Sequence, residues 1–160
     1  MGNLLIFAPE GTGCTYEGNV VINGIAEKIS LTHGKGFRSP QAFKAKDITY
    51  KRNFSMKSGN KINAAGWEAI VLPFDVQSFS NEKQGELAPF NSGKEGVKPF
   101  WLAQMTTDGF EHTTAMKANK PYIISLPNSE SYEDEFNISG EVQFHAEDAG
   151  GVEVKATSYK

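Results

Sequence analysis

The sequence of 160 residues contains a single cysteine, Cys14, so the chain has no internal disulfide. It also lacks any apolar run near the roughly 18–20 residues that a membrane-spanning helix needs. Cations are few: 16 Lys and Arg stand against 19 Asp and Glu, which gives a net charge of −3. Nucleic-acid-binding domains usually carry a clear positive excess. These absences exclude a disulfide-held scaffold and a helical membrane protein, and they argue against a DNA or RNA partner.

Motifs of common enzymes and metal sites are also lacking. Gly11-x-Gly13 has no third glycine of a dinucleotide fingerprint, and Cys14 beside it would need a histidine and an orienting acid to act as a nucleophile. The three histidines are widely spaced and show no zinc-ligand pattern. Ser80 and Lys83 have the spacing of serine/lysine acyl enzymes, but they lie in a polar segment without helical pattern. The sequence therefore predicts no catalytic residue, no metal ligand and no cofactor, in a chain that is not an enzyme.

The residues that are abundant favour β-structure. Sixteen glycines, seven prolines and eleven phenylalanines indicate many turns around an aromatic core. Residues 47–57 alternate between apolar and polar side chains, with only Arg52 breaking the apolar set, and residues 141–147 repeat the alternation. A period of two residues is typical of an antiparallel strand with one face in the core and one in solvent. In the first segment the apolar set consists of Ile48, Tyr50, Phe54 and Met56.

We therefore predict an all-β fold, an antiparallel β-sandwich of jelly-roll-like form with about nine or ten strands and little helix. Asn23-Gly24 predicts a type I′ hairpin turn, and Ser39-Pro40 a short helical turn. Residues 67–76 are apolar on both parities, which predicts a central strand interrupted at Pro73. Residues 78–98 are polar and broken by glycine, which predicts a long mobile loop. Further strands are expected at residues 4–8, 20–23, 26–32, 99–106, 112–117 and 122–126.

The length is that of one domain, and we expect a single domain over residues 1–160. No secretory signal precedes the first apolar residues. At the other end, Val152, Val154 and Ala156 alternate with polar residues almost to the last position, which is typical of a strand. We expect this chain to be a segment of a longer protein.

Aromatic residues make up 11% of the chain, and two exposed rings would form a platform on which a sugar ring stacks. Tyr132 is the leading candidate because its neighbours in residues 130–134 are polar, and their carboxylates would accept hydrogen bonds from sugar hydroxyls. The same acidic stretch lacks the layout of a calcium loop. Trp101 is the second candidate, although its apolar context, like that of Trp67 and Tyr122, favours packing in the core. We predict that any binding lies in the loops at residues 78–98 and 128–135.

Several strings that combine aromatic, proline and small residues at fixed spacing are spread over nearly the whole chain. They are Phe37-x(5)-Phe43, Tyr50-x-Arg52-x-Phe54, Gly66-Trp67-Glu68-x(3)-Leu72-Pro73-Phe74-Asp75-Val76, Phe100-Trp101, Ala118-Asn119-x-Pro121-Tyr122 and Gly140-x-Val142-x-Phe144. Together they resemble a β-rich module of secreted and surface-attached Bacteroidetes proteins, often appended to leucine-rich repeats. The resemblance implies export, exposure at the cell surface and further strands beyond this segment. That module has no assigned activity, so the resemblance supplies no catalytic residue.

Three functions remain open from the sequence. The first is a non-catalytic surface module for adhesion, assembly or scaffolding, since the motif residues are mainly of the kinds that build cores and turns. The second is a carbohydrate-binding module, which needs two coplanar exposed rings. The third is a hydrolase, which would need a carboxylate pair or a nucleophile that the sequence does not reveal. We expect a monomer, located outside the cell or on its surface, with a glycan or a surface protein as partner.

Overall fold

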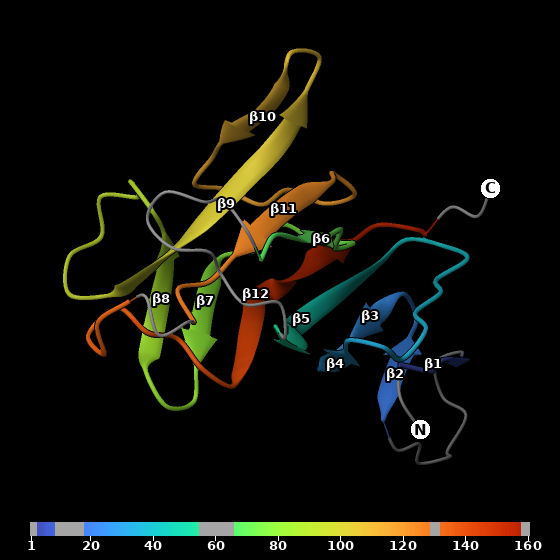
Figure 1. Ribbon diagram of the computed structural model, residues 1–160. Helices are drawn as coiled ribbons and strands as arrows, with labels where there is room; N and C mark the ends of the chain where they lie inside the picture. The colour runs from blue at the N-terminus through green and yellow to red at the C-terminus, as the bar shows by residue number, and fades with distance from the viewer. Residues whose placement is uncertain (1–2, 9–17, 55–65, 129–131, 158–160) are drawn as a thin grey trace.

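The computed structural model describes residues 3–8, 18–54, 66–128 and 132–157, and those residues form strands and turns without any helix (Figure 1). The prediction of an all-β fold is confirmed. Within these residues no helix is long and apolar enough to cross a membrane. The strands in chain order are β1 (Leu5–Ala8), β2 (Asn19–Ile22), β3 (Ile25–Ala26), β4 (Ile29–Thr32), β5 (Phe43–Asn53), β6 (Glu68–Ile70), β7 (Ser78–Asn81), β8 (Gly85–Pro89), β9 (Lys98–Thr106), β10 (Gly109–His112), β11 (Tyr122–Ser125) and β12 (Glu141–Val154).

All twelve strands belong to one hydrogen-bonded sheet, whose main path runs β1-β2-β3-β5-β12-β7-β8-β9-β11-β6. β4 pairs with β5 beside this path, and β10 pairs with β9. Most neighbours are antiparallel, but β1–β2, β3–β5, β4–β5 and β8–β9 are parallel. The sheet is therefore mixed, which corrects the expectation of a purely antiparallel arrangement. The expected nine or ten strands were too few, because residues 26–32 divide between β3 and β4, and residues 78–98 contain two unpredicted strands.

The two longest strands, β5 and β12, form the centre of the sheet and follow the predicted alternation. Ile48 pairs with Ala146 and Tyr50 with Phe144. Ile48, Phe144 and Ala146 are fully buried, and Tyr50 and Phe54 pack against the same core. Met56 and its neighbours lie outside the described residues. The ladder is interrupted between Glu147 and Val152 by a β-bulge or similar irregularity.

The predicted turn at Asn23-Gly24 is confirmed. Both residues have positive φ, 51° and 78°, as a type I′ turn requires, and Ile22 pairs with Ile25 across it. The helical turn predicted at Ser39-Pro40 is absent. Ser39 is instead fully buried, and its hydroxyl donates a 2.6 Å hydrogen bond to the carbonyl oxygen of Gln41.

Residues 67–76 do not form the predicted central strand. Only β6 is a strand there, and it lies at the end of the sheet path. Leu72 and Phe74 enter the core, whereas Val71 is 55% exposed. The chain leaves the sheet after Ile70, so the apolar side chains at odd and even positions in this segment do not come from one strand. The interruption expected at Pro73 lies in the part that has left the sheet.

The predicted loop at residues 78–98 is also wrong, because its first half is the hairpin of β7 and β8. Phe79 pairs with Leu87 and both are buried. Asn81 is 98% buried, and its side-chain amide donates hydrogen bonds to the carbonyl oxygens of Ser139 and Glu141 at 2.9 and 3.0 Å. The hydrophobicity pattern did not indicate this hairpin because some of its buried side chains are polar and hydrogen-bonded.

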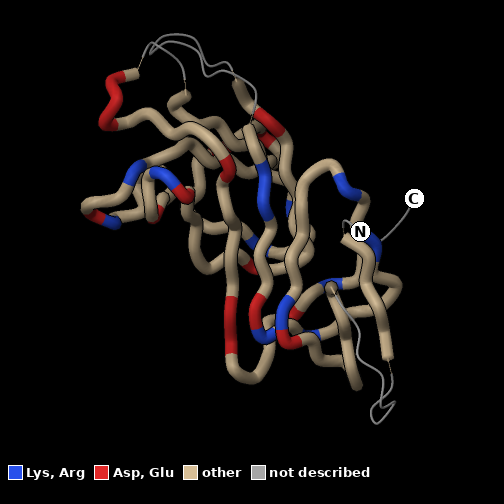
Figure 2. The backbone as a smooth tube through the Cα atoms, turned by 90° about the horizontal axis from the view of Figure 1, so that it is seen from below, with Lys and Arg blue, Asp and Glu red and all other residues tan. Residues whose placement is uncertain are grey.

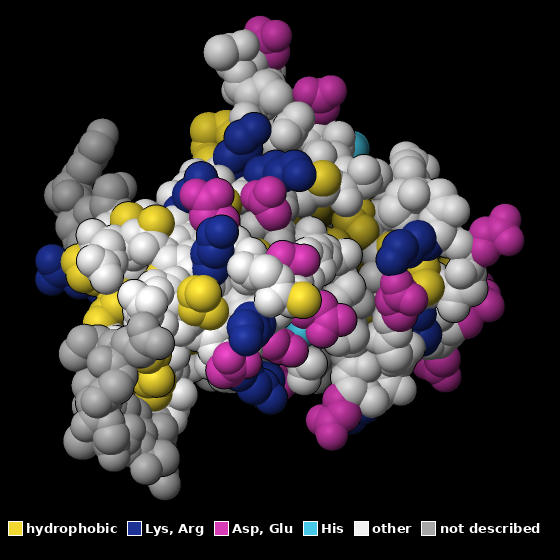
Figure 3. All heavy atoms as spheres, turned by 180° about the vertical axis from the view of Figure 1, so that it is seen from behind, with side chains coloured by type: hydrophobic (Ala, Val, Ile, Leu, Met, Phe, Trp, Pro, Cys, Tyr) yellow, Lys and Arg dark blue, Asp and Glu magenta, His cyan; other side chains and the backbone are white. Residues whose placement is uncertain are grey.

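Charged side chains are mixed along the described backbone. Lys, Arg, Asp and Glu are scattered along the backbone in Figure 2, with blue and red segments close together in several places and a run of acidic residues at the upper left. On the face seen in Figure 3, hydrophobic side chains form small separate groups between charges of both signs.

The parity of β5 predicts unequal costs of truncation at two sites on opposite faces of the strand. Ile48→Ala should lower the free energy of unfolding by about 2–5 kcal/mol because it removes a fully buried side chain. Lys51→Ala, on the half-exposed side of the same strand, should change it by less than about 0.5 kcal/mol. Urea unfolding of both variants measures this, and equal losses would refute the register.

Candidate functional site

The structure brings together the two residues that the sequence predicted for ligand binding. Trp101 lies on β9, and Tyr132 follows β11 in the chain. Their ring centroids are 5.5 Å apart with an interplanar angle of 55°. Both residues are half-buried. In the structure, the two candidate rings are therefore in direct contact, but they are tilted and not coplanar.

The segment that carries Tyr132 is fastened to β9 by polar contacts. The ammonium group of Lys98 donates to the carbonyl oxygens of Asp134 and Asn137 at 3.0 and 3.2 Å. The backbone nitrogen of Ile138 donates to the carbonyl oxygen of Pro127 at 2.8 Å, which closes the base of the segment. Lys98 lies three residues before Trp101, so the same strand holds one ring and anchors the turn behind the other.

Strand alternation explains why Trp101 does not enter the core. Its neighbours Phe100 and Leu102 are each 1% exposed and point into the core, so Trp101 projects from the opposite face of β9. The sequence-based preference for a buried Trp101 is therefore corrected. The five consecutive apolar residues at positions 99–103 conceal its parity, because the positions that alternate with Phe100 and Leu102 also carry Pro, Trp and Ala.

A second ring pair lies beside the first on this part of the sheet. His112 pairs in register with Ala103, two residues from Trp101, and its ring lies 6.4 Å from that of Trp67. Trp67 is half-buried, so its predicted place in the core is also corrected. We call Trp67, Trp101, His112 and Tyr132 the aromatic face.

Carboxylates border the aromatic face next to Tyr132. Glu133, Asp134 and Glu135 are all exposed, and the backbone nitrogen of Phe136 donates to the carbonyl oxygen of Glu133 at 2.9 Å. Rings offer flat apolar surfaces, and carboxylates accept hydrogen bonds. The arrangement can therefore bind a ligand that presents both an apolar face and hydroxyl groups.

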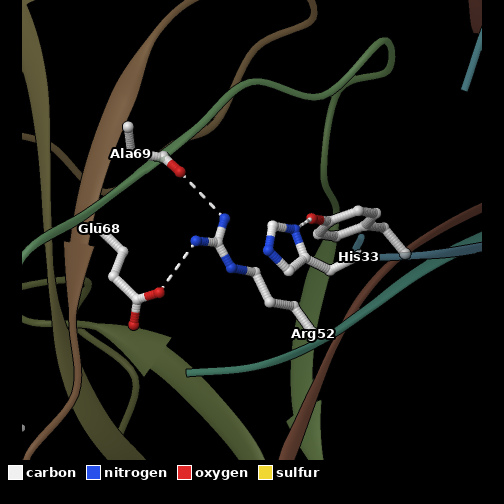
Figure 4. Close-up of polar contacts among 5 residues, drawn as sticks. His33, Arg52, Glu68 and Ala69 are labelled. Atoms are coloured by element: carbon white, nitrogen blue, oxygen red, sulfur yellow. Dashed lines mark hydrogen bonds and ion pairs between the residues drawn. The ribbon is translucent and has the colours of Figure 1, made fainter. Parts of the chain in front are cut away.

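A buried polar cluster lies between β5 and β6 (Figure 4). Arg52 is 8% exposed and donates from Nη1 to the carbonyl oxygen of Ala69 at 2.9 Å and from Nη2 to Oε1 of Glu68 at 3.0 Å. The Glu68 side chain is 13% exposed. The guanidinium carbon also lies 4.8 Å from the centroid of the Phe54 ring, a cation–π contact. The residue that broke the apolar pattern of β5 is thus an ion-pair partner within the core.

Tyr50 and His33 extend this cluster toward a small pocket. His33 Nδ1 lies 2.8 Å from the Tyr50 hydroxyl oxygen, and both residues line a cavity of about 140 Å³ together with Leu72 and Pro73. Burial raises the pKa of the Tyr50 hydroxyl above its ordinary value, and the charge of Arg52 offsets part of the increase. Sequence reasoning noted Arg52 as an exception but did not find Glu68 as its partner, because the two residues lie on strands remote in the sheet path.

The weaker sequence motifs fall in unrelated places. Ser80 lies on β7 and Lys83 in the turn after it, so no helix brings their side chains together. Cys14 and Glu130 lie outside the described residues. His33 and His112 lie in the separate environments described above.

Comparison of the chain with protein-family models, curated proteins and solved structures returned no significant match. The resemblance to a Bacteroidetes surface module stays a prediction.

The contact between Trp101 and Tyr132 is testable by fluorescence. In a Trp67→Phe background, Trp101 is the sole tryptophan, and Tyr132→Ala should shift its emission to longer wavelength because the ring loses its cover. In a Trp101→Phe background, the same substitution should leave the Trp67 emission unchanged. Identical Trp101 spectra with and without Tyr132 would contradict the contact.

Proposed function

We propose that this chain is a non-catalytic module of the cell surface that binds carbohydrate on its aromatic face. The observation that carries the proposal is the contact between the rings of Trp101 and Tyr132, two half-buried residues from distant parts of the sequence. Core packing alone gives no reason for both rings to meet outside the core. Export and attachment to a longer surface protein are parts of the proposal that rest on the sequence resemblance.

The chemistry of the aromatic face suits a sugar in three respects. The C–H faces of a pyranose ring are apolar and stack on aromatic side chains, whereas its hydroxyls donate hydrogen bonds. Exposed carboxylates at residues 133–135 supply acceptors beside the Tyr132 ring. Lys98 holds the turn in place before any ligand arrives, which limits the entropy cost of binding. The 55° tilt between the rings favours a bent or twisted glycan over a flat one.

The fold expected for such a module is part of the same proposal. In a jelly-roll-like sandwich, one sheet would carry the aromatic face, and the second sheet would pack against the inner side of the first. Contacts of Arg52 between β5 and β6 favour a sheet that closes over its own core.

A second candidate function, adhesion or assembly, is favoured by the hairpin of β9 and β10, which projects from the rest of the molecule in Figure 1. Met105 and Phe110 pair across it and are 60% and 58% exposed. β10 is exposed along its whole length and pairs with β9 alone. An exposed edge strand with apolar side chains can accept a strand from another chain.

Affinity electrophoresis in gels containing neutral polysaccharides tests the first proposal. Trp101→Ala and Tyr132→Ala should each lower the affinity calculated from the retardation by at least about tenfold, which corresponds to about 1.4 kcal/mol of binding free energy. Phe110→Ala is the matched control, an exposed aromatic residue outside the aromatic face, and should retain wild-type affinity.

The thermal unfolding temperature should change little in all three variants. Full retention of polysaccharide binding in both Trp101→Ala and Tyr132→Ala would contradict the proposal. Loss of binding in Phe110→Ala alone would transfer the site to the β9–β10 hairpin.

A further inference from the structure

A mixed group of one imidazole and two carboxylates lies on the outward side of the central strands. Asp47 is on β5, and His145 and Glu147 are on β12. One ligand atom from each lies within 4.8 Å of the others, and His145 Nε2 is 3.3 Å from Asp47 Oδ1. From this geometry we infer that Asp47, His145 and Glu147 form a site for a divalent transition-metal ion, with zinc as the best-suited ion.

Strand geometry brings these side chains together. His145 and Glu147 are two residues apart on one strand, so both point to the same face, opposite to the buried Phe144 and Ala146. Asp47 pairs in register with Glu147 across the antiparallel ladder. A search for helical histidine spacings misses this set, because on a strand the equivalent motif is His-x-Glu with a third ligand from the neighbouring strand.

The charges of the group call for a cation. Like charges directly opposite each other in an antiparallel pair destabilise the sheet, and Asp47 and Glu147 are such a pair. Lys46, the residue before Asp47, has another partner and contacts Glu27 at 2.8 Å. A divalent ion bound between the two carboxylates would offset this repulsion.

The donor set and spacing fit zinc better than calcium or magnesium. Zinc accepts imidazole nitrogen and carboxylate oxygen at about 2.0–2.2 Å, so ligand atoms in a tetrahedral site lie about 3.3–3.6 Å apart. The Nε2–Oδ1 distance of 3.3 Å already has this value, and one ligand atom of each residue lies within 4.8 Å of the other two. Calcium and magnesium prefer ligand sets made of oxygen alone. All three residues are at least partly exposed, so a fourth position remains open to water.

The backbone around the site is held in place on the side of β12 that faces β7. Gln77 donates from its backbone nitrogen to the carbonyl oxygen of His145 at 2.9 Å and accepts at Oε1 from the backbone nitrogen of Glu147 at 3.1 Å. Gln77 thus holds the backbone at both proposed ligand positions of β12, His145 and Glu147. The irregularity that begins after Glu147 ends the regular pairing next to the site, a place where β-bulges frequently orient functional side chains.

Isothermal titration of the tag-free chain with zinc chloride tests the site. A Cys14→Ser background removes the thiol as a competing ligand. We expect one zinc ion per chain, with manganese binding more weakly and calcium and magnesium showing no saturable binding at the same concentrations. His145→Ala and Asp47→Asn should each weaken zinc binding at least tenfold.

His112→Ala is the control, because it removes an exposed histidine of the aromatic face, and zinc affinity should be unchanged. Asp47→Asn keeps the side-chain volume and removes one of two opposed charges, so it tests ligation without endangering the fold. Addition of zinc should also raise the thermal unfolding temperature of the Cys14→Ser chain, but not that of Asp47→Asn. No saturable zinc binding, or equal affinity in His145→Ala, would show that the group is only an ion pair and overturn the inference.

Discussion

The ion pair between Arg52 and Glu68 is the contact on which the shape of this protein depends. In the path of the sheet, β12, β7, β8, β9 and β11 separate β5 from β6, yet Arg52 of β5 reaches both the carboxylate of Glu68 and the backbone of Ala69 in β6. The sheet therefore curls until its last strand lies against its centre.

The burial of this pair makes it costly to break. Removing one partner of a buried ion pair leaves an uncompensated charge in the core, which typically costs 3–5 kcal/mol. The Phe54 ring beside the guanidinium adds a further favourable contact. Because β6 pairs with β11 and β11 with β9, the position of β6 is transmitted to the strand that carries Trp101. The proposed binding face and the closure of the sheet are thus parts of one arrangement.

The sequence was sufficient to predict what short-range patterns encode. The alternation in residues 47–54 and 141–147 predicted the two central strands, and Asn23-Gly24 predicted its turn, because side-chain parity and positive φ are local properties. The polar context of Tyr132 and the aromatic character of Trp101 made them candidates, although their contact was not predicted. Long-range contacts have no such signature. Arg52 was only an exception in a pattern until β6 was placed beside it, and His145 gained Asp47 as a neighbour from the pairing of β5 with β12.

The errors have physical causes as well. Residues 78–89 were too polar to resemble core strands, but the burial of Asn81 is balanced by its hydrogen bonds to Ser139 and Glu141. Residues 71–76 were too apolar to resemble a connecting segment, but Leu72 and Phe74 enter the core outside the strands. In both segments hydropathy was a poor guide to strand positions, because side-chain polarity and strand pairing do not coincide there.

A double-mutant cycle on Arg52 and Glu68, measured by urea unfolding, tests the central claim most directly. Arg52→Met and Glu68→Met should each lower the free energy of unfolding by about 3–5 kcal/mol, because each leaves one charge buried without its partner. The double variant replaces the pair with apolar side chains and should lose far less than the sum, so the coupling energy should exceed about 2 kcal/mol. Additive losses, with a coupling energy near zero, would show that the sheet closes without this pair.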